Sequence, residues 1–278
     1  MITKVTSDYK NILRTFEKLC DVCIQLSINT HNRKVESGQC IYGSQIFTKF
    51  ISHAIAIRKL LPESTLFNLP GNLQLWDISS IAVLVRALME TYNVFYYLTI
   101  DKVSTEEWKF RFILWRYHAE CQRLKMLKAI RSVNPEITNI EINLEKLRDD
   151  LLKDPFYNLQ PFKIRNKFLG GDRGIALTNS EISERAGIAK EYYKTSYAYS
   201  SNYTHSYPFS LQQLKVFKAE DEESLNLIIT QIKTSSGYMC FAIRDYIKIF
   251  PDQSSLKSGV EEEMETYIHI LGNIGEPM

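Results

Sequence analysis

The chain has 278 residues, and its 34 lysine and arginine residues nearly balance its 32 aspartate and glutamate residues, for a net charge of +2. Hydrophobic residues make up 45% and charged residues 24%, which is ordinary for a globular protein. The balanced charge excludes a basic surface over the whole chain, so any contact with RNA or DNA has to come from a local patch.

The N-terminal stretch MITKVTSDYKNILRTFEKL is charged and amphipathic, without the apolar core or cleavage site of a signal peptide. The five cysteines are scattered and odd in number, which fits a reducing compartment. We therefore expect a cytoplasmic protein. The most apolar stretch, residues 81–100, contains Arg86 and Glu90, whose charges would be costly in a bilayer. We expect it to be a buried helix and expect no membrane contact.

Apolar residues recur at helical spacing along most of the chain, which predicts an all-α bundle of about seven or eight helices. Pro62 stops the second helix, and residues 63–72, ESTLFNLPGN, have the composition of a turn. Ser104 and Glu107 form a capping box, and a break is expected near Gly187. The helices are expected at about 7–28, 44–61, 77–100, 105–132, 140–153, 180–206, 219–249 and 259–271.

Residues 155–177 contain two prolines and three glycines and show no helical period. They predict an irregular insertion, a long loop or a loop with a short hairpin around Gly170 and Gly171. Long loops inside compact domains are often functional. Because the sequence shows no repeat and no linker, we expect a single all-α domain over 1–278. Residues 252–278 would supply its C-terminal helix and tail.

Four polar residues form a stripe on the apolar helix at 77–100. Arg86, Glu90, Asn93 and Tyr97 are spaced i, i+4, i+7 and i+11, on one helical face. A buried charge is costly unless it is paired, so two interpretations stay open. Either the stripe only fixes the packing, or it lines a polar pocket with Arg86 and Glu90 as catalytic and Asn93 and Tyr97 as ligand-binding residues.

A second polar stripe lies in the tyrosine- and serine-rich helix that ends before Pro208. It consists of Lys194, Tyr197, Ser201 and His205, about one turn apart. A histidine near neutrality acts as an acid or base, or binds phosphate when it is charged. Ser201 and His205 are therefore candidate catalytic residues, and Lys194 and Tyr197 are candidate ligand-binding residues. The alternative is that His205 caps the helix; in either case, we expect the two stripes to meet inside the bundle.

The helix FRFILWRYHAECQR contains Arg111 and, after six intervening residues, His118. This spacing resembles that of HEPN domains, all-α bundles of which many are metal-independent ribonucleases with an Arg and a His separated by four to six intervening residues. The resemblance implies that Arg111 and His118 are catalytic. The alternative is that Arg111 pairs with Glu107, one turn before it.

The segments RALMETYNVFYYL (86–98) and SSNYTHSYP (200–208) together resemble a family of uncharacterised bacterial helical proteins. That family has an Arg-x3-Glu helix in its first half and a Ser/Tyr-rich helix ending in His in its second half, and is itself distantly HEPN-like. The resemblance covers about residues 40–250. It implies a shared polar site at Arg86, Glu90, Ser201 and His205, without an established reaction.

Two functions stay open, besides nucleic-acid binding without catalysis, against which the nearly balanced charge argues. The first is a HEPN-like, metal-independent ribonuclease of a toxin or antiviral defence system, acting on RNA as a homodimer. Arg86 or Arg111 would stabilise the phosphate, His205 or His118 would be the acid or base, and Glu90 would orient the histidine. The alternative is a non-catalytic sensor or interaction module with a partner protein. The same cluster would then be a structural hydrogen-bond network or a small-ligand site.

Cys20 and Cys23 form a CxxC pair inside a helix. Because no second pair follows at matching spacing, we expect two buried thiols rather than a metal site, and we expect no metal and no cofactor. Solvated charge is the default interpretation of two basic runs, and contact with a phosphate backbone is the alternative. The runs are Arg123, Lys125, Lys128 and Arg131, and Lys163, Arg165, Lys167 and Arg173.

Overall fold

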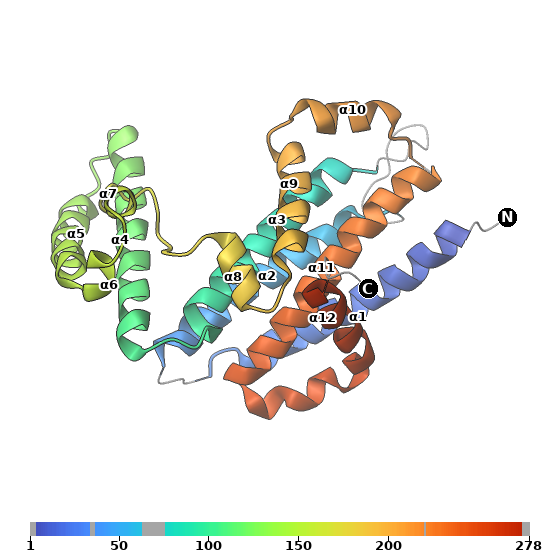
Figure 1. The fold of residues 1–278 in the computed structure, drawn as a ribbon, viewed down its shortest axis with the longest axis horizontal. Helices are drawn as coiled ribbons and strands as arrows, with labels where there is room; N and C mark the ends of the chain where they lie inside the picture. Colours follow the sequence, from blue (N-terminus) through green and yellow to red (C-terminus); the bar gives the residue numbers. More distant parts are fainter. Residues whose placement is uncertain (1–3, 34–36, 63–75, 220, 274–278) are drawn as a thin grey trace. The chain divides into compact units, whose positions relative to one another are not determined.

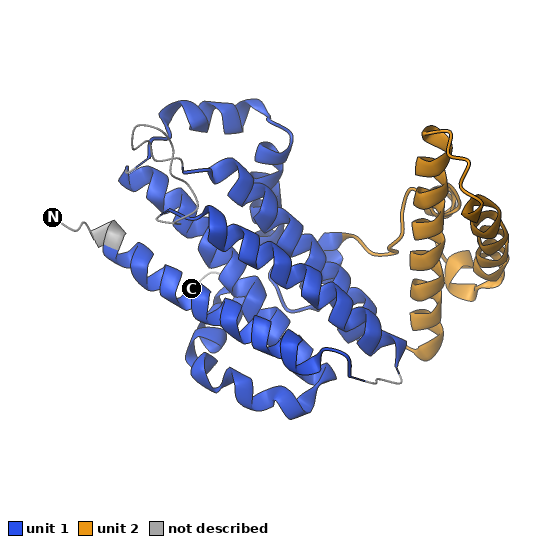
Figure 2. Ribbon diagram, turned by 180° about the vertical axis from the view of Figure 1, so that it is seen from behind, with its two compact units in different colours: residues 1–101, 179–278 blue, residues 102–178 orange. Residues whose placement is uncertain are grey.

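The computed structural model describes residues 4–33, 37–62, 76–219 and 221–273 (Figure 1). All regular secondary structure in these ranges is helical, which confirms the all-α class. The turn expected at 63–72 lies outside the described residues. The chain divides into two compact units, residues 1–101 with 179–278, and residues 102–178 (Figure 2).

The larger unit is built around α11, whose residues are buried without interruption from Thr234 to Ile243. A helical segment buried at ten successive positions is covered by other elements on all sides. Aromatic rings join its neighbours: Phe47 stacks on Tyr246 with ring centres 3.9 Å apart. The elements of this unit are α1 (Lys4–Thr30), α2 (Gly38–Leu60), α3 (Ile78–Phe95), the π-helical η2 (Tyr96–Ile100), α8 (Asn179–Arg185), α9 (Lys190–Thr204), α10 (Pro208–Val216), α11 (Glu222–Ile249), the 3-10 helix η3 (Pro251–Gly259) and α12 (Glu261–Asn273).

The smaller unit contains α4 (Thr105–Ala129), α5 (Glu136–Lys153), α6 (Pro155–Asn158) and α7 (Phe162–Leu169). The predicted cap of α4 is present, because Ser104 Oγ accepts a hydrogen bond of 3.1 Å from the backbone N–H of Glu107. The core of the smaller unit is a separate apolar cluster that includes the buried Phe110, Leu114 and Phe168. Each unit therefore has its own apolar core.

The irregular loop expected over 155–177 is wrong for residues 155–169, which form the two short helices α6 and α7, and the described residues 170–178 contain no hairpin strands. Pro155 is the first residue of α6, and Pro161 precedes α7. A proline at the start of a helix loses no hydrogen bond, so these prolines begin helices instead of interrupting them. The turn after α7 packs on α4 at Gly171, which has φ +66°, and a Cβ there would lie 2.3 Å from Cys121 Cβ.

The described residues hold twelve α-helices, more than the seven or eight expected. Besides α6 and α7, the excess comes from α10, which begins at Pro208, where a helix was expected only to end. The helix expected at 180–206 is divided into α8 and α9, with the predicted break at Gly187. By length and apolar composition alone, the described segment Ile78–Ile100 meets the criteria for a membrane-spanning helix. The buried core helix of a protein outside the membrane meets the same criteria.

Candidate functional site

The two predicted polar stripes meet where α3 contacts α9. Arg86 Nε donates a hydrogen bond of 3.1 Å to Glu90 Oε1, and Arg86 Nη2 donates one of 2.6 Å to the Tyr197 hydroxyl. The guanidinium carbon also lies 4.5 Å from the centre of the Tyr197 ring. We call Arg86, Glu90 and Tyr197 the Arg86 cluster. It joins two helices that are more than a hundred residues apart in sequence.

The Arg86 cluster is partly open to solvent. The side chains of Arg86 and Glu90 are 17% and 37% exposed. Arg86 Nη1 is buried and has no hydrogen-bond partner among the described residues. Burial raises the pKa of the adjacent Tyr193, and the charge of Glu90 adds to the effect, so Tyr193 stays protonated. The site therefore contains a guanidinium group, that of Arg86, fixed by two hydrogen bonds, and next to it the neutral hydroxyl of Tyr193.

Asn93 and Tyr97 lie deeper than the Arg86 cluster. Asn93 is fully buried, donates a hydrogen bond of 3.1 Å to the carbonyl of Asn179 and accepts one of 3.0 Å from Ser183 Oγ. Tyr97 is 1% exposed and belongs to the π-helical η2, where the regular spacing of the stripe ends. The amide of Asn93 thus connects α3 to α8 inside the fold.

The remaining residues of the α9 stripe do not reach the Arg86 cluster. Ser201 Oγ donates to the carbonyl of Tyr197 at 2.7 Å, and Lys194 forms an exposed ion pair with Glu191 at 2.9 Å. His205 is exposed at the C-terminal cap of α9, and its ring lies 5.2 Å from that of Tyr207. Within the described residues, no hydrogen bond or ion pair joins His205 to Glu90.

Arg111 and His118 both lie on α4, in the smaller unit. Arg111 is 1% exposed, and its Nε and Nη2 donate to Glu107 Oε1 at 3.0 and 2.6 Å, which is the pairing given as the alternative. Burial lowers the pKa of His118, and the charge of Lys125 lowers it further. The neutral imidazole is therefore favoured, while the Arg111 guanidinium is already bound.

A second charged cluster, centred on Asp245 of α11, was missed by the sequence analysis. Asp245 is 0% exposed and accepts hydrogen bonds from the Tyr92 hydroxyl at 2.8 Å, from Arg244 at 2.8 and 2.9 Å and from Lys248 at 2.7 Å. Burial raises the pKa of Tyr92 well above its usual value, with a further contribution from Asp245. We call Asp245, Tyr92, Arg244 and Lys248 the Asp245 cluster.

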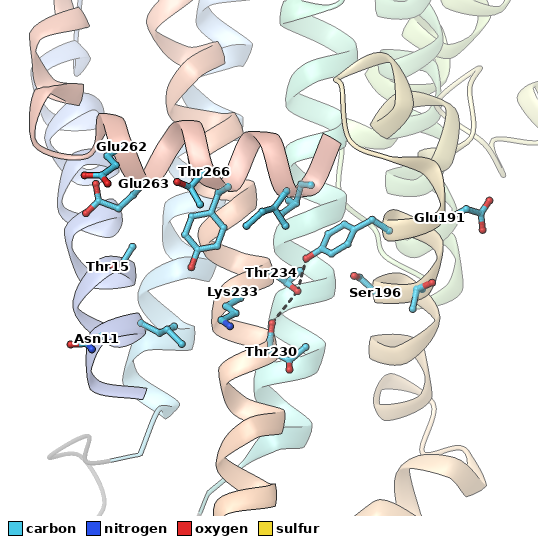
Figure 3. Close-up of a pocket in the computed structure, with 16 residues that line it drawn as sticks. Asn11, Thr15, Glu191, Ser196, Thr230, Lys233, Thr234, Glu262, Glu263 and Thr266 are labelled. Atoms are coloured by element: carbon cyan, nitrogen blue, oxygen red, sulfur yellow. Dashed lines mark hydrogen bonds between the residues drawn. The ribbon is translucent and has the colours of Figure 1, made fainter. Parts of the chain in front are cut away.

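A groove of about 920 Å³ is bounded by α1, α9, α11 and α12 (Figure 3). Helix α12 closes on α11 at Gly237, where a Cβ would lie 2.5 Å from Leu271 Cδ2. Across the groove, the Tyr192 hydroxyl and Thr234 Oγ1 are 2.9 Å apart. The lining residues are Asn11, Ile12, Thr15, Glu191, Tyr192, Thr195, Ser196, Thr230, Lys233, Thr234, Glu262, Glu263, Thr266, Tyr267, Ile270 and Leu271. No sequence motif marks this groove, because its walls come from both ends of the chain.

The basic runs of the sequence belong to the smaller unit. Residues 102–178 contain fifteen lysines and arginines and ten aspartates and glutamates, a net charge of +5 that leaves −3 for the larger unit. Lys125 Nζ donates a hydrogen bond of 2.6 Å to the carbonyl of Gly170 and forms an ion pair with Asp172 at 2.9 Å. These contacts join the basic half of α4 to the end of α7. Arg173 instead donates to the backbone carbonyls of Ile175 and Ala176.

The CxxC cysteines are two buried thiols, as expected. Cys20 is 1% and Cys23 0% exposed. Burial raises the pKa of Cys20 to about 12, so the thiol stays protonated. In the part of the chain that the structure describes, no three histidine, cysteine or carboxylate residues gather where they could hold a metal ion.

These observations define an all-helical protein with a polar contact between α3 and α9. A family model matches residues 41–224, more than half of the chain, so the chain belongs to that family, a family of unknown function (DUF5677). The match contains both segments that resembled an uncharacterised helical family, 86–98 and 200–208. No curated protein and no solved structure matches the chain. Three of the four helices that line the groove, α1, α11 and α12, lie wholly or mostly outside the matched residues.

Proposed function

We propose that the chain is a non-catalytic helical sensor module that binds a small molecule in the groove between α1, α9, α11 and α12. The observation that carries this proposal is the groove itself, whose volume of about 920 Å³ is within the usual range of small-molecule sites. A ligand there would contact segments from both ends of the chain. It would therefore stabilise the larger unit as it binds.

In this proposal the Arg86 cluster is structural. Arg86 is held by Glu90 on its own helix and by Tyr197 on α9, so the cluster fixes how α3 packs against α9. Tyr192 precedes Tyr197 on the same helix and lines the groove. The cluster thereby positions the helix that supplies one wall of the ligand site.

Ribonuclease activity, and with it the relation to HEPN domains and to toxin or defence systems, stays a prediction with weaker support. His205 is exposed and makes no hydrogen bond or ion pair with Glu90 among the described residues. Arg111 is buried and bound to Glu107. A catalytic site would need a histidine and an arginine that both reach one phosphate.

RNA binding without cleavage is a second candidate function, favoured by one observation. The smaller unit carries a net charge of +5 in 77 residues, although the whole chain carries only +2. The balanced total charge therefore does not count against RNA binding by this unit. Such binding would weaken steeply with rising salt concentration, because it releases counterions.

The groove is tested with N-phenyl-1-naphthylamine, a neutral apolar dye that fluoresces when it is bound. We expect saturable binding with one dye per chain. Thr195→Trp, which places an indole in the groove, should abolish binding. The matched control is Thr138→Trp on an exposed position of α5, which should leave binding unchanged. Absent binding, or equal binding by both variants, would contradict the ligand site.

The same protein is incubated with labelled single-stranded RNA without metal, and the RNA is analysed for length and for retention on the protein. We expect intact RNA. Cleavage that disappears in His118→Ala or in His205→Ala would overturn the non-catalytic assignment. Retention at low salt that is lost at high salt would support RNA binding by the basic unit.

A further inference from the structure

The groove combines an apolar wall with a single cation. Tyr192, Tyr267, Ile270 and Leu271 supply the apolar surface, and Ile270 is 44% exposed. Among the described residues that line the groove, Lys233 is the only cation, and it makes no ion pair in the described part of the chain. Figure 3 shows Lys233 on α11, between Thr15 of α1 and Ser196 of α9.

Two of the three glutamates around the groove are already neutralised from outside it. Glu191 pairs with Lys194 at 2.9 Å, and Glu263 pairs with Lys18 at 3.6 Å. Figure 3 shows the Glu191 carboxylate pointing away from α11. Glu262 is exposed in the first turn of α12 and has no ion pair among the described residues. Lys233 and Glu262 are thus the two charged residues of the groove that have no ion-pair partner among the described residues and that a ligand would contact.

Hydrogen-bonding side chains lie on both sides of Lys233. Asn11 and Thr15 come from α1, and Ser196 comes from α9. An amide and two hydroxyls beside an ammonium group are suited to an anionic oxygen head, because each of them can donate a hydrogen bond to it. The apolar side chains further along the groove would contact the rest of such a molecule.

We propose that the groove binds an amphipathic monocarboxylate, a molecule with an apolar chain and one carboxylate, and that Lys233 holds the carboxylate. This inference rests on the proposed ligand-binding function and adds the chemical class of the ligand. An amine head placed among Asn11, Thr15 and Ser196 would be repelled by Lys233. A second negative charge on the head would find no second cation among the described lining residues, so the groove favours a single negative charge.

The test compares three ten-carbon ligands that differ only in the head group: decanoate, decan-1-ol and decylammonium. Each is titrated against N-phenyl-1-naphthylamine bound to the whole chain at low salt, below the micelle concentration of the two charged ligands and below the solubility limit of decan-1-ol. We expect decanoate to bind about tenfold more tightly than decan-1-ol, as a charge-assisted contact requires, and decylammonium to bind least.

Lys233→Met should remove the advantage of decanoate over decan-1-ol and leave the binding of decan-1-ol unchanged. Lys233→Arg should keep most of the advantage. The matched control is Lys215→Met on α10, an exposed lysine outside the groove, which should behave like the unchanged protein. Circular dichroism confirms that each variant is folded.

The outcomes separate this inference from the proposed function. If decan-1-ol or decylammonium binds as well as decanoate, or if Lys233→Met keeps the preference, the carboxylate assignment is overturned and the groove remains a ligand site. If the dye binds but no ten-carbon ligand displaces it, the inference also falls. If the dye itself fails to bind in the groove, the proposed function fails first.

Discussion

Helix α3 takes part in two charged clusters that differ in their exposure to water. In the Arg86 cluster, the side chains of Arg86 and Glu90 are 17% and 37% exposed. In the Asp245 cluster, the carboxylate is fully buried and Tyr92 of α3 donates to it. The same kinds of group therefore occupy two different dielectric surroundings on one helix.

This difference indicates which cluster stabilises the fold. A partly exposed ion pair contributes little, because water screens it and two side chains must be held in place. Removing the buried carboxylate of the second cluster is far more costly, because Arg244 and Lys248 lose their counter-charge and the buried Tyr92 hydroxyl loses its acceptor. We therefore expect stability to depend on Asp245 much more than on Arg86, although the sequence draws attention to Arg86.

The largest expected effect is that of Asp245→Ala, which leaves the Tyr92 hydroxyl without its acceptor and removes the counter-charge of Arg244 and Lys248. It should lower the free energy of unfolding by about 3–5 kcal/mol, measured by urea denaturation. Asp245→Asn, which keeps the shape and one acceptor oxygen, should cost less and keep the chain folded if the alanine variant does not fold. Asp252→Ala is the control, since Asp252 forms a surface pair with Arg33 at 2.7 Å and should matter little. Equal losses at Asp245 and Asp252 would refute the comparison.

The Arg86 cluster should show a smaller but measurable coupling between helices. A double-mutant cycle with Arg86→Met and Tyr197→Phe removes the hydrogen bond of 2.6 Å and weakens the contact of the cation with the ring. We expect a coupling free energy of about 1 kcal/mol by urea denaturation. Pairing Arg86→Met with His205→Ala instead should give strictly additive effects. Coupling in the second cycle and none in the first would mean that the cluster is assigned to the wrong residues.

Local patterns in the sequence predicted much of this fold. Apolar spacing located the long helices, and Ser104 marked the start of α4, because caps and helical faces depend only on neighbouring residues. Pro208 was misinterpreted as an end, since the same residue also begins α10. The Arg86–Tyr197 contact was predicted in outline, from polar residues on otherwise apolar faces.

The Asp245 cluster and the groove were not predicted, for different reasons. Arg244, Asp245 and Lys248 interrupt the apolar run FAIRDYIKIF and offered the same signal as Arg86, so the cluster could have been found. The groove offered no such signal, because it depends on how four helices pack, including the close approach of α12 at Gly237. Shapes of this kind arise from contacts between distant segments, which spacing along one helix does not record.

The smallest expected effect is that of His205→Ala, and it separates the two stripes most sharply. If His205 belonged to a buried network, its loss would orphan hydrogen-bonding partners and lower the melting temperature clearly. In the structure its side chain is exposed, with its ring 5.2 Å from that of Tyr207. The free energy of unfolding should therefore change by less than about 0.5 kcal/mol, as is usual for surface positions. A loss above about 1 kcal/mol in urea denaturation would mean that His205 joins the Arg86 cluster, which would restore the Arg–Glu–His site inferred from the sequence.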